Sequence, residues 1–362
     1  MKFLVVPDSF KGGVTSERFC DIFTSLAKGH ETICFPGGDG GEGTIEKLTK
    51  ITNGEFIDTI VLDGNFEPKS CAYGATADVA YVSISNSSGL PDTKEKNPEI
   101  TTSFGFGEQI LDAIKKGKKE IILCLGGSST NDGGCGMLSA LGAKFYDKEF
   151  NEFVPTGCNV GDVVAVNLKE LNKNIKGIKF KALCDVKNPL IGPKGCSYTF
   201  APQKGATTKE MQDELEKQMV HFAEFSKILD GNPNLEGAGA AGGLGFAIQT
   251  YLKGQLIHGA TYFLDLIDFD AKAKTVDYVI TGEGKFDATS LGGKICGTVI
   301  KRSEGVNKPV AVFCGAKGNT DMNVKTKVDV ISINNPSMSL EENIKNGEKN
   351  LENAIREFLG KF

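Results

Sequence analysis

Short β-rich runs that alternate with helical segments constrain the fold of this chain more than any other feature. Residues 1–7 read as a first strand, residues 15–28 place apolar side chains at helical spacing, and residues 32–35 form a second apolar run. The same kind of run, in most cases followed by Gly, Asp or Asn, returns at residues 120–125, 180–184, 278–281, 310–314 and 330–333. This alternation predicts an α/β fold with a mostly parallel sheet, whose loops at the carboxyl ends of the strands form the functional site.

A different pattern lies between residues 55 and 85. Three β-rich runs, at residues 56–62, 72–77 and 79–84, follow one another with no room for helices between them. This spacing predicts antiparallel pairing and a second sheet, inserted into the first domain. Two domains also suit a chain of 362 residues, which exceeds the usual length of one domain.

Two helix starts carry the pattern of a capping box, in which a hydroxyl side chain is followed three residues later by Glu. They are Thr207 with Glu210, and Ser339 with Glu342. We expect a helix to begin at each pair, with its apolar stripe packed in the core. In the second helix this stripe contains Ile344, Leu351 and Ile355.

Composition and charge narrow the class of protein. Apolar residues make up 40% and charged residues 24% of the chain, as in ordinary soluble globular proteins. The net charge of -5 comes from interspersed basic and acidic side chains, so we expect no nucleic-acid or membrane partner. Ten cysteines without a Cys-x-x-Cys pair predict buried, reduced thiols. No signal peptide or long apolar run occurs, which favours a cytoplasmic protein. The oligomeric state does not follow from the sequence.

Glycines combine with acids, amides or hydroxyls in five segments. They are residues 7–12, 37–43, 126–134, 184–189 and 281–287. Glycine allows the backbone to approach a ligand and to direct N–H groups at anionic oxygens. Residues 126–134 also precede a predicted helix at residues 137–141, whose N-terminus favours a phosphate. The alternative for any one segment is a tight turn without a ligand, but five together favour a ligand site.

Carboxylates within these segments would repel a bare phosphate, and Asp39, Asp132 and Glu283 are examples. Mg²⁺ would resolve this, because it binds carboxylate oxygens together with nucleotide phosphates. Alternatively, some of these acids bind substrate hydroxyls. Only three arginines occur, all in or beside predicted helices, so we expect Mg²⁺ and lysines to neutralise the charge of the transferring phosphoryl group. The candidates are Lys11, Lys187, Lys204, Lys285 and Lys294, with solvent exposure as the alternative, strongest for Lys187 and Lys204.

Known nucleotide motifs are absent or out of context. The chain has no Gly-x4-Gly-Lys-Ser/Thr segment, so it is not a P-loop enzyme. Residues 237–242 fit Gly-x-Gly-x-x-Gly, but Asn232 and Pro233 stand where a strand is required. Residues 38–43 fit the same pattern after a predicted strand, and Asp63 lies at the expected distance. A nicotinamide-dependent oxidoreductase of a small hydroxy acid is therefore one alternative, although acids within this turn would face the pyrophosphate.

In order along the chain, these segments resemble the bacterial glycerate kinase family of the kind that forms 2-phosphoglycerate. The resemblance rests on the joint order and spacing of residues 7–12, 39–44, 126–137, 185–190, 202–206, 237–245 and 281–294. It implies ATP as phosphoryl donor, D-glycerate as acceptor and Mg²⁺ as cofactor, with 2-phospho-D-glycerate and ADP as products. It also implies a Rossmann-like domain, which we place at residues 1–54 and 270–362, joined to a mixed α/β domain inserted at residues 55–269.

We assign roles within this framework as hypotheses. Asp185 would orient and deprotonate the glycerate hydroxyl, with capping of a turn as its alternative role. Lys11 or Lys285 would stabilise the transferring charge, and Glu283 or Asp287 would hold Mg²⁺. Phosphate binding is assigned to Gly126, Gly127, Ser128, Ser129, Thr130 and Asn131, and substrate binding to Ser9, Asp39, Asn188 and Lys294. A non-enzymatic sensor that binds a small hydroxy acid with the same loops is a further alternative.

Overall fold

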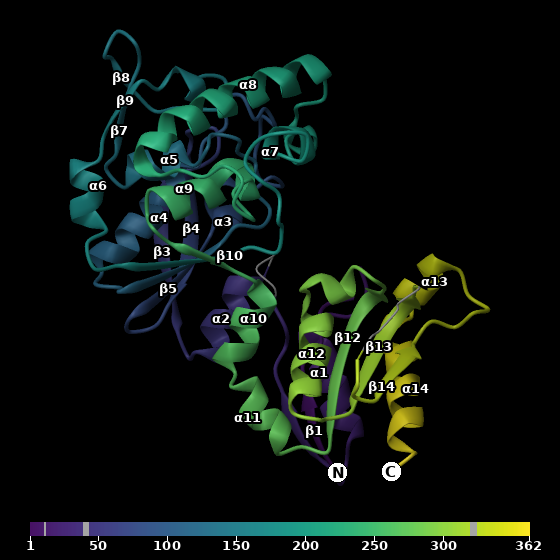
Figure 1. Ribbon diagram of the computed structural model, residues 1–362. Coiled ribbons are helices and arrows are strands. Elements are labelled where there is room, and N and C mark those ends of the chain that lie inside the picture. The colour runs from purple at the N-terminus through teal and green to yellow at the C-terminus, as the bar shows by residue number, and fades with distance from the viewer. Residues whose placement is uncertain (11, 39–42, 319–323) are drawn as a thin grey trace. The chain divides into compact units, whose positions relative to one another are not determined.

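A computed structural model of the chain describes residues 1–10, 12–38, 43–318 and 324–362. The chain divides into two compact units (Figure 1). Unit 1 comprises Met1–Asp39 and His258–Phe362, and unit 2 comprises Gly40–Ile257. Unit 1 thus contains both ends of the chain, and unit 2 is a continuous segment between its two parts. The domain boundaries that we expected near residues 54 and 270 stay a prediction.

Unit 1 is built on a five-stranded parallel sheet with the order β14-β13-β12-β1-β2. Its strands are β1 (Lys2–Val5), β2 (Glu31–Cys34), β12 (Tyr278–Phe286), β13 (Val310–Lys317) and β14 (Val328–Ser332). From β1 the chain passes to β2 on one side, and it later returns to β12 on the other side of β1. The strand order therefore reverses between β1 and β12, and in open α/β sheets ligands bind beyond the carboxyl ends of the strands at such a point.

Helices cover both faces of this sheet. They are α1 (Ser16–Leu26), α10 (Gly259–Leu266), α11 (Phe269–Lys274), α12 (Ile295–Gly305), α13 (Leu340–Lys345) and α14 (Gly347–Leu359), with the 3-10 turn η5 (Ser290–Gly292). Successive side chains of β1 point to opposite faces. Phe3 packs in the cluster that contains Phe19 of α1 and Phe358 of α14, whereas Leu4 is equally buried on the opposite face.

Unit 2 contains a six-stranded mixed sheet with the order β11-β10-β6-β5-β4-β3. Its strands are β3 (Glu55–Leu62), β4 (Pro68–Ala75), β5 (Val79–Ser83), β6 (Glu120–Cys124), β10 (Lys179–Leu183) and β11 (Gln255–Ile257). The pairs β3-β4 and β4-β5 are antiparallel, which confirms the prediction for residues 56–84, and β5, β6, β10 and β11 run parallel. A small antiparallel sheet contains β7 (Lys144–Tyr146), β8 (Glu152–Phe153) and β9 (Ala165–Asn167).

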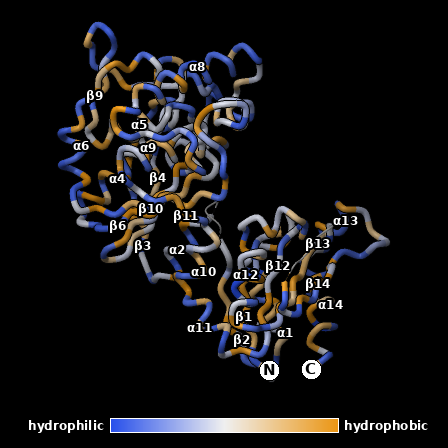
Figure 2. The backbone as a smooth tube through the Cα atoms, viewed as in Figure 1, coloured by the Kyte–Doolittle hydropathy of each residue, from blue (hydrophilic) through white to orange (hydrophobic). Residues whose placement is uncertain are grey.

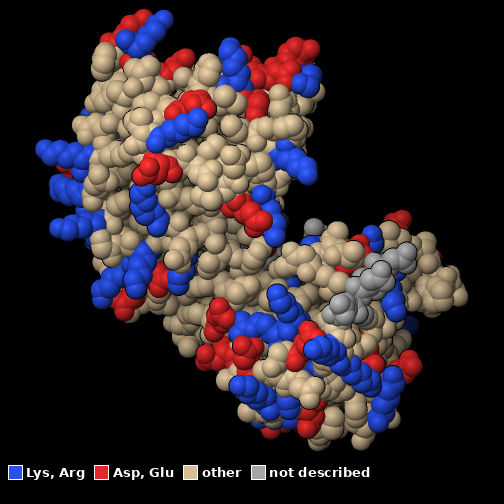
Figure 3. All heavy atoms as spheres, viewed as in Figure 1, with Lys and Arg blue, Asp and Glu red and all other residues tan. Residues whose placement is uncertain are grey.

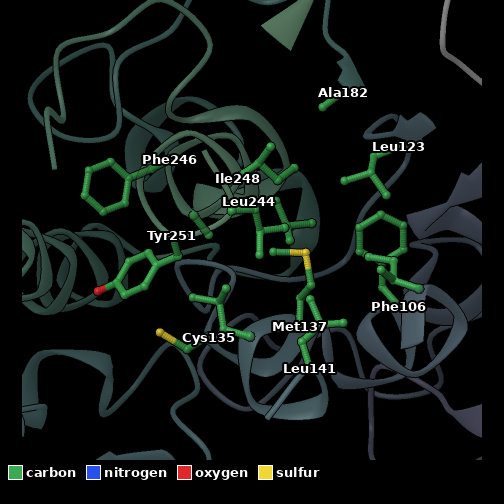
Figure 4. Packing of buried hydrophobic residues seen from close by; sticks show 14 of the residues in the cluster. Phe106, Leu123, Cys135, Met137, Leu141, Ala182, Leu244, Phe246, Ile248 and Tyr251 are labelled. Carbon is green, nitrogen blue, oxygen red and sulfur yellow. The ribbon is translucent and has the colours of Figure 1, made fainter. Parts of the chain in front are cut away.

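The helices of unit 2 enclose a large apolar core. They are α2 (Thr44–Ile51), α3 (Ile84–Ser88), α4 (Phe104–Lys115), α5 (Cys135–Ala140), α6 (Lys169–Asn174), α7 (Cys196–Thr199), α8 (Lys209–Ser226) and α9 (Leu244–Thr250), with 3-10 turns η1 (Val160–Asp162), η2 (Pro202–Lys204), η3 (Lys227–Leu229) and η4 (Ala240–Gly243). Figure 4 shows Met137 of α5 beside Leu244 of α9 within this core. The loop that precedes α5 is therefore anchored on packed side chains.

Hydropathy and charge follow this packing. Hydrophobic segments gather inside each unit, and hydrophilic segments such as parts of α8 lie at its periphery (Figure 2). Acidic and basic side chains are interspersed on the visible face of each unit (Figure 3). All ten cysteines are free thiols, and most of them are buried. No helix within the described residues combines the length and the apolar character that crossing a membrane requires.

Strand β12 is longer than the sequence indicated. We expected a strand at residues 278–281 followed by a glycine loop, but β12 continues to Phe286. The reason is tertiary: β13 pairs with β12 as far as Phe286 and Lys317, and this ladder outweighs the low strand propensity of Gly282 and Gly284. Glu283, which lies between these two glycines, is therefore held on a rigid strand.

The two predicted helix starts have different outcomes. The capping box of Ser339 and Glu342 is confirmed. Helix α8 instead takes Thr208 as its N-cap, whose hydroxyl accepts a hydrogen bond from the Met211 N–H at 3.2 Å, so Thr207 was one residue early. Residues 340–359 also form two helices instead of one, because the helix is interrupted at Asn346, just before Gly347.

Candidate functional site

A cavity of about 500 Å³ lies in unit 1 beyond the carboxyl ends of its parallel strands. Its polar wall comes from four neighbouring strands and contains Asp8 and Ser9 after β1, Glu283 and Lys285 on β12, Gly315 on β13, and Asn334 after β14. Its apolar wall contains Phe10, Val14, Ile333, Leu340 and Ile344. The cavity thus sits where the reversed strand order predicts a ligand.

Glu283 is a buried carboxylate in this cavity. Its side chain is 5% exposed, and Oε1 has no hydrogen-bond partner among the described residues. The Asp8 N–H donates to the Gly282 carbonyl at 2.7 Å, so an extension of β1 places Asp8 alongside. Burial raises the pKa of Glu283, and a hydrogen bond from Ser290 offsets only part of this effect. A buried oxygen without a partner is costly, which points to a ligand that satisfies it.

Asp287 differs from Glu283 because both of its oxygens are already bonded. Oδ1 accepts hydrogen bonds from the Thr289 hydroxyl at 2.6 Å and from its N–H at 2.9 Å, and Oδ2 pairs with Lys285 Nζ at 2.9 Å. The Thr289 hydroxyl and then Lys285 hold the pKa of Asp287 well below its usual range. Within the described ranges, no three His, Cys, Asp or Glu side chains are grouped for a metal ion. Of the two assigned acids, Glu283 therefore fits a cation better.

Five of the residues that we assigned from sequence line this single cavity. They are Ser9, Glu283, Lys285, Asp287 and Lys294. Lys294 is exposed and occupies the N-cap position of α12. Lys11 and Asp39, which we assigned to charge stabilisation and substrate binding, lie outside the described residues. The sequence thus identified the polar wall of the cavity, whereas its apolar wall was missed in part, since Ile344 was expected in the core but is 40% exposed.

The loop at residues 126–131 in unit 2 connects β6 to α5. Ser129 is fully buried, and both its N–H and its hydroxyl donate to the Ser88 carbonyl at 3.0 Å. Thr130 Oγ1 and Asn131 Oδ1 are buried and have no hydrogen-bond partner in the part of the chain that the structure describes. Thr130 Oγ1 could donate or accept a hydrogen bond, and Asn131 Oδ1 could accept one, if a ligand reaches the loop.

The helix N-terminus behind this loop does not serve a phosphate in the way we expected. Asp132 is fully buried and accepts hydrogen bonds from the N–H groups of Gly134 at 3.0 Å and Gly136 at 3.2 Å. The Ser103 hydroxyl donates to Asp132 at 2.8 Å and accepts from the Met137 N–H at 2.9 Å. Burial raises the pKa of Asp132, and these bonds offset part of the rise. The first amides of α5 are thus occupied, and the phosphate assignment rests on the loop itself.

The loop after β10 holds the candidate base. Asp185 is exposed directly beyond the carboxyl end of this strand. The Asn188 amide donates to the Lys194 carbonyl at 2.7 Å and to Thr199 Oγ1 at 3.3 Å. Asn188 therefore shapes the loop from residue 188 to residue 199, which gives it a structural role. The catalytic role of Asp185 and the substrate-binding role of Asn188 stay predictions.

Lys204 is the residue that the sequence analysis misjudged. Solvent exposure was its favoured alternative, yet Lys204 is 2% exposed, and Nζ donates to Ser128 Oγ and to the Thr130 carbonyl, each at 2.8 Å. A signal was present in the glycine that follows. Gly205 has φ of +118°, and an added Cβ there would lie 1.9 Å from the Lys96 carbonyl oxygen, so this turn is held tightly against the chain.

Comparison with known proteins supports the family resemblance that the order of the glycine-rich segments indicated. The chain matches the glycerate kinase family over residues 3–361. It is 37% identical to a glycerate kinase of Bacillus cereus, over 97% of this chain and 95% of that one. It is 33% identical to a glycerate 2-kinase of Escherichia coli, over 87% of this chain and 85% of that one.

A solved structure extends the likeness to three dimensions. The crystal structure of a protein assigned as glycerate kinase 2 from Salmonella typhimurium LT2 has a TM-score of 0.87 and 31% sequence identity to this chain. The similarity covers 100% of this chain and 98% of that protein. Sequence and fold therefore agree over essentially the whole length. The chain belongs to the glycerate kinase family.

Proposed function

We propose that this chain transfers the γ-phosphoryl group of ATP to D-glycerate, which forms 2-phospho-D-glycerate and ADP. The observation that carries the proposal is the family match along nearly the whole chain, with relatives named glycerate kinase and glycerate 2-kinase. Phosphoryl transfer depends mainly on positioning and electrostatic stabilisation, so the polar groups of each unit are the natural participants.

In unit 1, two lysines and a hydroxyl group of the cavity suit a hydroxy acid. Lys294 is positioned at the wall to attract a carboxylate, and Ser9 offers a hydroxyl for hydrogen bonding. Lys285 would stabilise negative charge on the transferring group, and its present partner Asp287 keeps it at the cavity. We also include Lys11 and Asp39 in this set on the resemblance alone.

Mg²⁺ is part of the proposal as the cofactor. Glu283 supplies a buried oxygen without a partner among the described residues, which is the type of ligand that this hard cation prefers. Asp287 would first have to release Lys285. When bound, the ion would reduce the negative charge of the nucleotide phosphates. Removal of Mg²⁺ with a chelator should abolish turnover, and added Mg²⁺ should restore it.

In unit 2, we assign residues 126–131 to phosphate oxygens and Asp185 to the base. Ser128 and Thr130 have hydroxyls, and Asn131 has an amide, all within one short loop. Asp185 lies beyond the carboxyl end of a parallel strand, the usual place for reacting groups in such sheets. A carboxylate there would accept the proton of the glycerate hydroxyl during attack on the γ-phosphate.

A coupled assay tests the proposed function directly. Purified protein is mixed with ATP, Mg²⁺ and D-glycerate, and ADP release is followed with and without glycerate. We expect ADP release that depends on glycerate. Tight glycerate binding without ADP release would instead support the sensor, and an absorbance change with a nicotinamide cofactor and no ATP would support the oxidoreductase.

A further inference from the structure

The ammonium group of Lys204 connects two separate parts of unit 2. Lys204 ends the short turn η2, and its Nζ reaches back to the loop between β6 and α5. There it donates to Ser128 Oγ and to the Thr130 carbonyl, each at 2.8 Å. A lysine carries three donors and no acceptor, so both bonds run from the lysine to the loop. The loop is thus shaped by a buried cation.

The positive charge of Lys204 has no paired carboxylate within the described residues. The carboxylate that acts on this charge is Asp132, whose oxygens already accept bonds from Ser103, Gly134 and Gly136. Burial lowers the pKa of Lys204 to about 8, while Cys196 and Asp132 act in the opposite direction. An uncompensated buried charge is costly, and such groups are retained where they serve a function.

Donation from Lys204 also settles the role of the Ser128 hydroxyl. One lone pair of Ser128 Oγ accepts a hydrogen bond from the lysine, and the ammonium cannot accept a hydrogen bond in return. The Ser128 O–H therefore points away from Lys204. It is strengthened as a donor, because its oxygen is polarised by a neighbouring cation. Such a donor suits an anionic oxygen.

We propose that Lys204 is a positioning residue that fixes Ser128 so that the Ser128 hydroxyl donates to an anionic oxygen of the bound substrate. This inference rests on the proposed function, in which the loop at residues 126–131 contacts a substrate. A phosphate oxygen of the nucleotide and the carboxylate of the hydroxy acid share the required chemistry. The experiment below separates these two sources.

The test is a double-mutant cycle on Lys204→Met and Ser128→Ala in the full chain. Titration calorimetry measures the Kd of ATP and of D-glycerate separately, and the coupled assay measures kcat and both KM values. We expect each single variant to weaken the binding of one substrate by about tenfold or more, the effect of losing a hydrogen bond to a charged group. The double variant should bind no more weakly than the weaker single variant.

The substrate that is affected identifies the anion. Weaker ATP binding assigns Ser128 to a phosphate, and weaker D-glycerate binding assigns it to the carboxylate. Lys217→Met is the matched control, because this lysine of α8 is exposed and its ion pair with Glu214, at 3.1 Å, lies at the surface. It should retain wild-type Kd values.

Three results would overturn the inference. Unchanged Kd values in Ser128→Ala would do so even if Lys204→Met failed to fold, because Ser128→Ala removes the proposed donor directly. Independent, multiplicative losses in the double variant would show that the two residues do not act together. An equal loss of affinity in Lys217→Met would show a general effect of surface charge. A wild-type protein that binds ATP but does not phosphorylate glycerate would contradict the proposed function and leave the binding cycle interpretable.

Discussion

Glu283 is a residue whose burial and bonding conflict unless a ligand is present. The carboxylate lies on a rigid strand, is almost fully buried and keeps one oxygen without a partner among the described residues. Folding gains nothing from such a group, because charge is removed from water without full compensation. A ligand in the surrounding cavity that bonds to this oxygen would explain why the protein retains the group.

Glu283→Gln should therefore separate stability from activity. We expect kcat to fall by about 10²-fold or more, because a group that positions the transferring phosphate or its cation is lost. Burial raises the folded-state pKa of Glu283, so the contribution of this side chain to stability falls as pH rises from the ordinary glutamate range through the raised value. The variant should lose this part of the pH dependence and be at least as stable at pH 7, as urea denaturation at several pH values would show. A variant that is both active and less stable would contradict a catalytic role.

Asp185→Asn tests the candidate base. The amide keeps the size of the side chain but cannot accept a proton, so we expect kcat to fall by about 10²-fold or more with little change in the melting temperature. Asp78→Asn serves as the control, because Asp78 is an exposed acid of unit 2 that pairs with Lys119 at 2.7 Å. Near-normal kcat in Asp185→Asn would leave this residue with its turn-capping role.

The lowered pKa of Lys204 also leads to a prediction about stability, in addition to the double-mutant cycle on substrate binding. Its folded-state pKa of about 8 lies below the usual lysine value, so this side chain binds more protons in the unfolded state between about pH 8 and pH 10.5. The contribution of Lys204 to stability therefore rises with pH across this range. The shift corresponds to about 3 kcal/mol at neutral pH. Lys204→Met removes this cost but leaves Ser128 and Thr130 without their donor, at about 1–3 kcal/mol each.

The net change in the free energy of unfolding should therefore be small at pH 7, within about 2–3 kcal/mol. The variant should also lose this contribution, so its stability relative to wild type should fall between about pH 8 and pH 10.5. Buried thiols such as Cys196, whose pKa burial raises to about 12, lower stability as pH rises in this range, but they do so in wild type and variant alike. The difference between the two proteins therefore isolates Lys204. Chemical denaturation at pH 7.5 and pH 9.5 checks both points. An identical pH dependence of stability in wild type and variant would contradict the assignment of the titration to Lys204.

At the scale of elements, the packing of turn η4 against the candidate phosphate loop depends on a glycine. Gly242 has φ of +67°, and an added Cβ would lie 2.0 Å from the Thr130 carbonyl oxygen. Gly177 has φ of +80° with no atom within 4 Å of such a Cβ. The pair isolates the clash, because both positions carry the same backbone preference.

Gly177→Ala should cost about 1–2 kcal/mol, from the left-handed conformation alone. Gly242→Ala should cost about 1–3 kcal/mol more, because the loop must shift to make room. The shift should also weaken substrate binding in Gly242→Ala but not in Gly177→Ala. Urea denaturation and calorimetry measure both effects. Equal costs would show that η4 does not determine the position of the loop.

The elements also show where sequence reasoning succeeds and fails. The alternation of strands and helices was predictable because the spacing of apolar residues within each element reflects which of its faces is buried. The confirmed capping box of Ser339 and Glu342 was also predictable, because it depends only on residues close together in the sequence. Strand β12 extended beyond its prediction because pairing with β13, a contact distant in sequence, decides its length. The exposure of Ile344 and the burial of Lys204 depend equally on tertiary neighbours, which periodicity does not report.

At the scale of the whole molecule, the order of glycine-rich segments along the chain was the most informative feature. It identified the family, and five assigned residues lie around one cavity in unit 1. The sequence could not rank these residues, because Glu283 and Asp287 differ in their burial and in the bonds that their neighbours make. Burial and hydrogen-bond satisfaction are properties of the folded units, and they supply the ranking.

The most direct test of the proposed activity is ³¹P NMR of a reaction that contains the protein, ATP, Mg²⁺ and D-glycerate. We predict that the γ-phosphate signal of ATP decreases while the signals of ADP and 2-phospho-D-glycerate appear in equal amounts. In proton-coupled spectra the product should be a doublet, because its phosphate is attached to a carbon that carries one hydrogen. A triplet would place the phosphate on the 3-hydroxyl, and an unchanged ATP spectrum would contradict the kinase activity altogether.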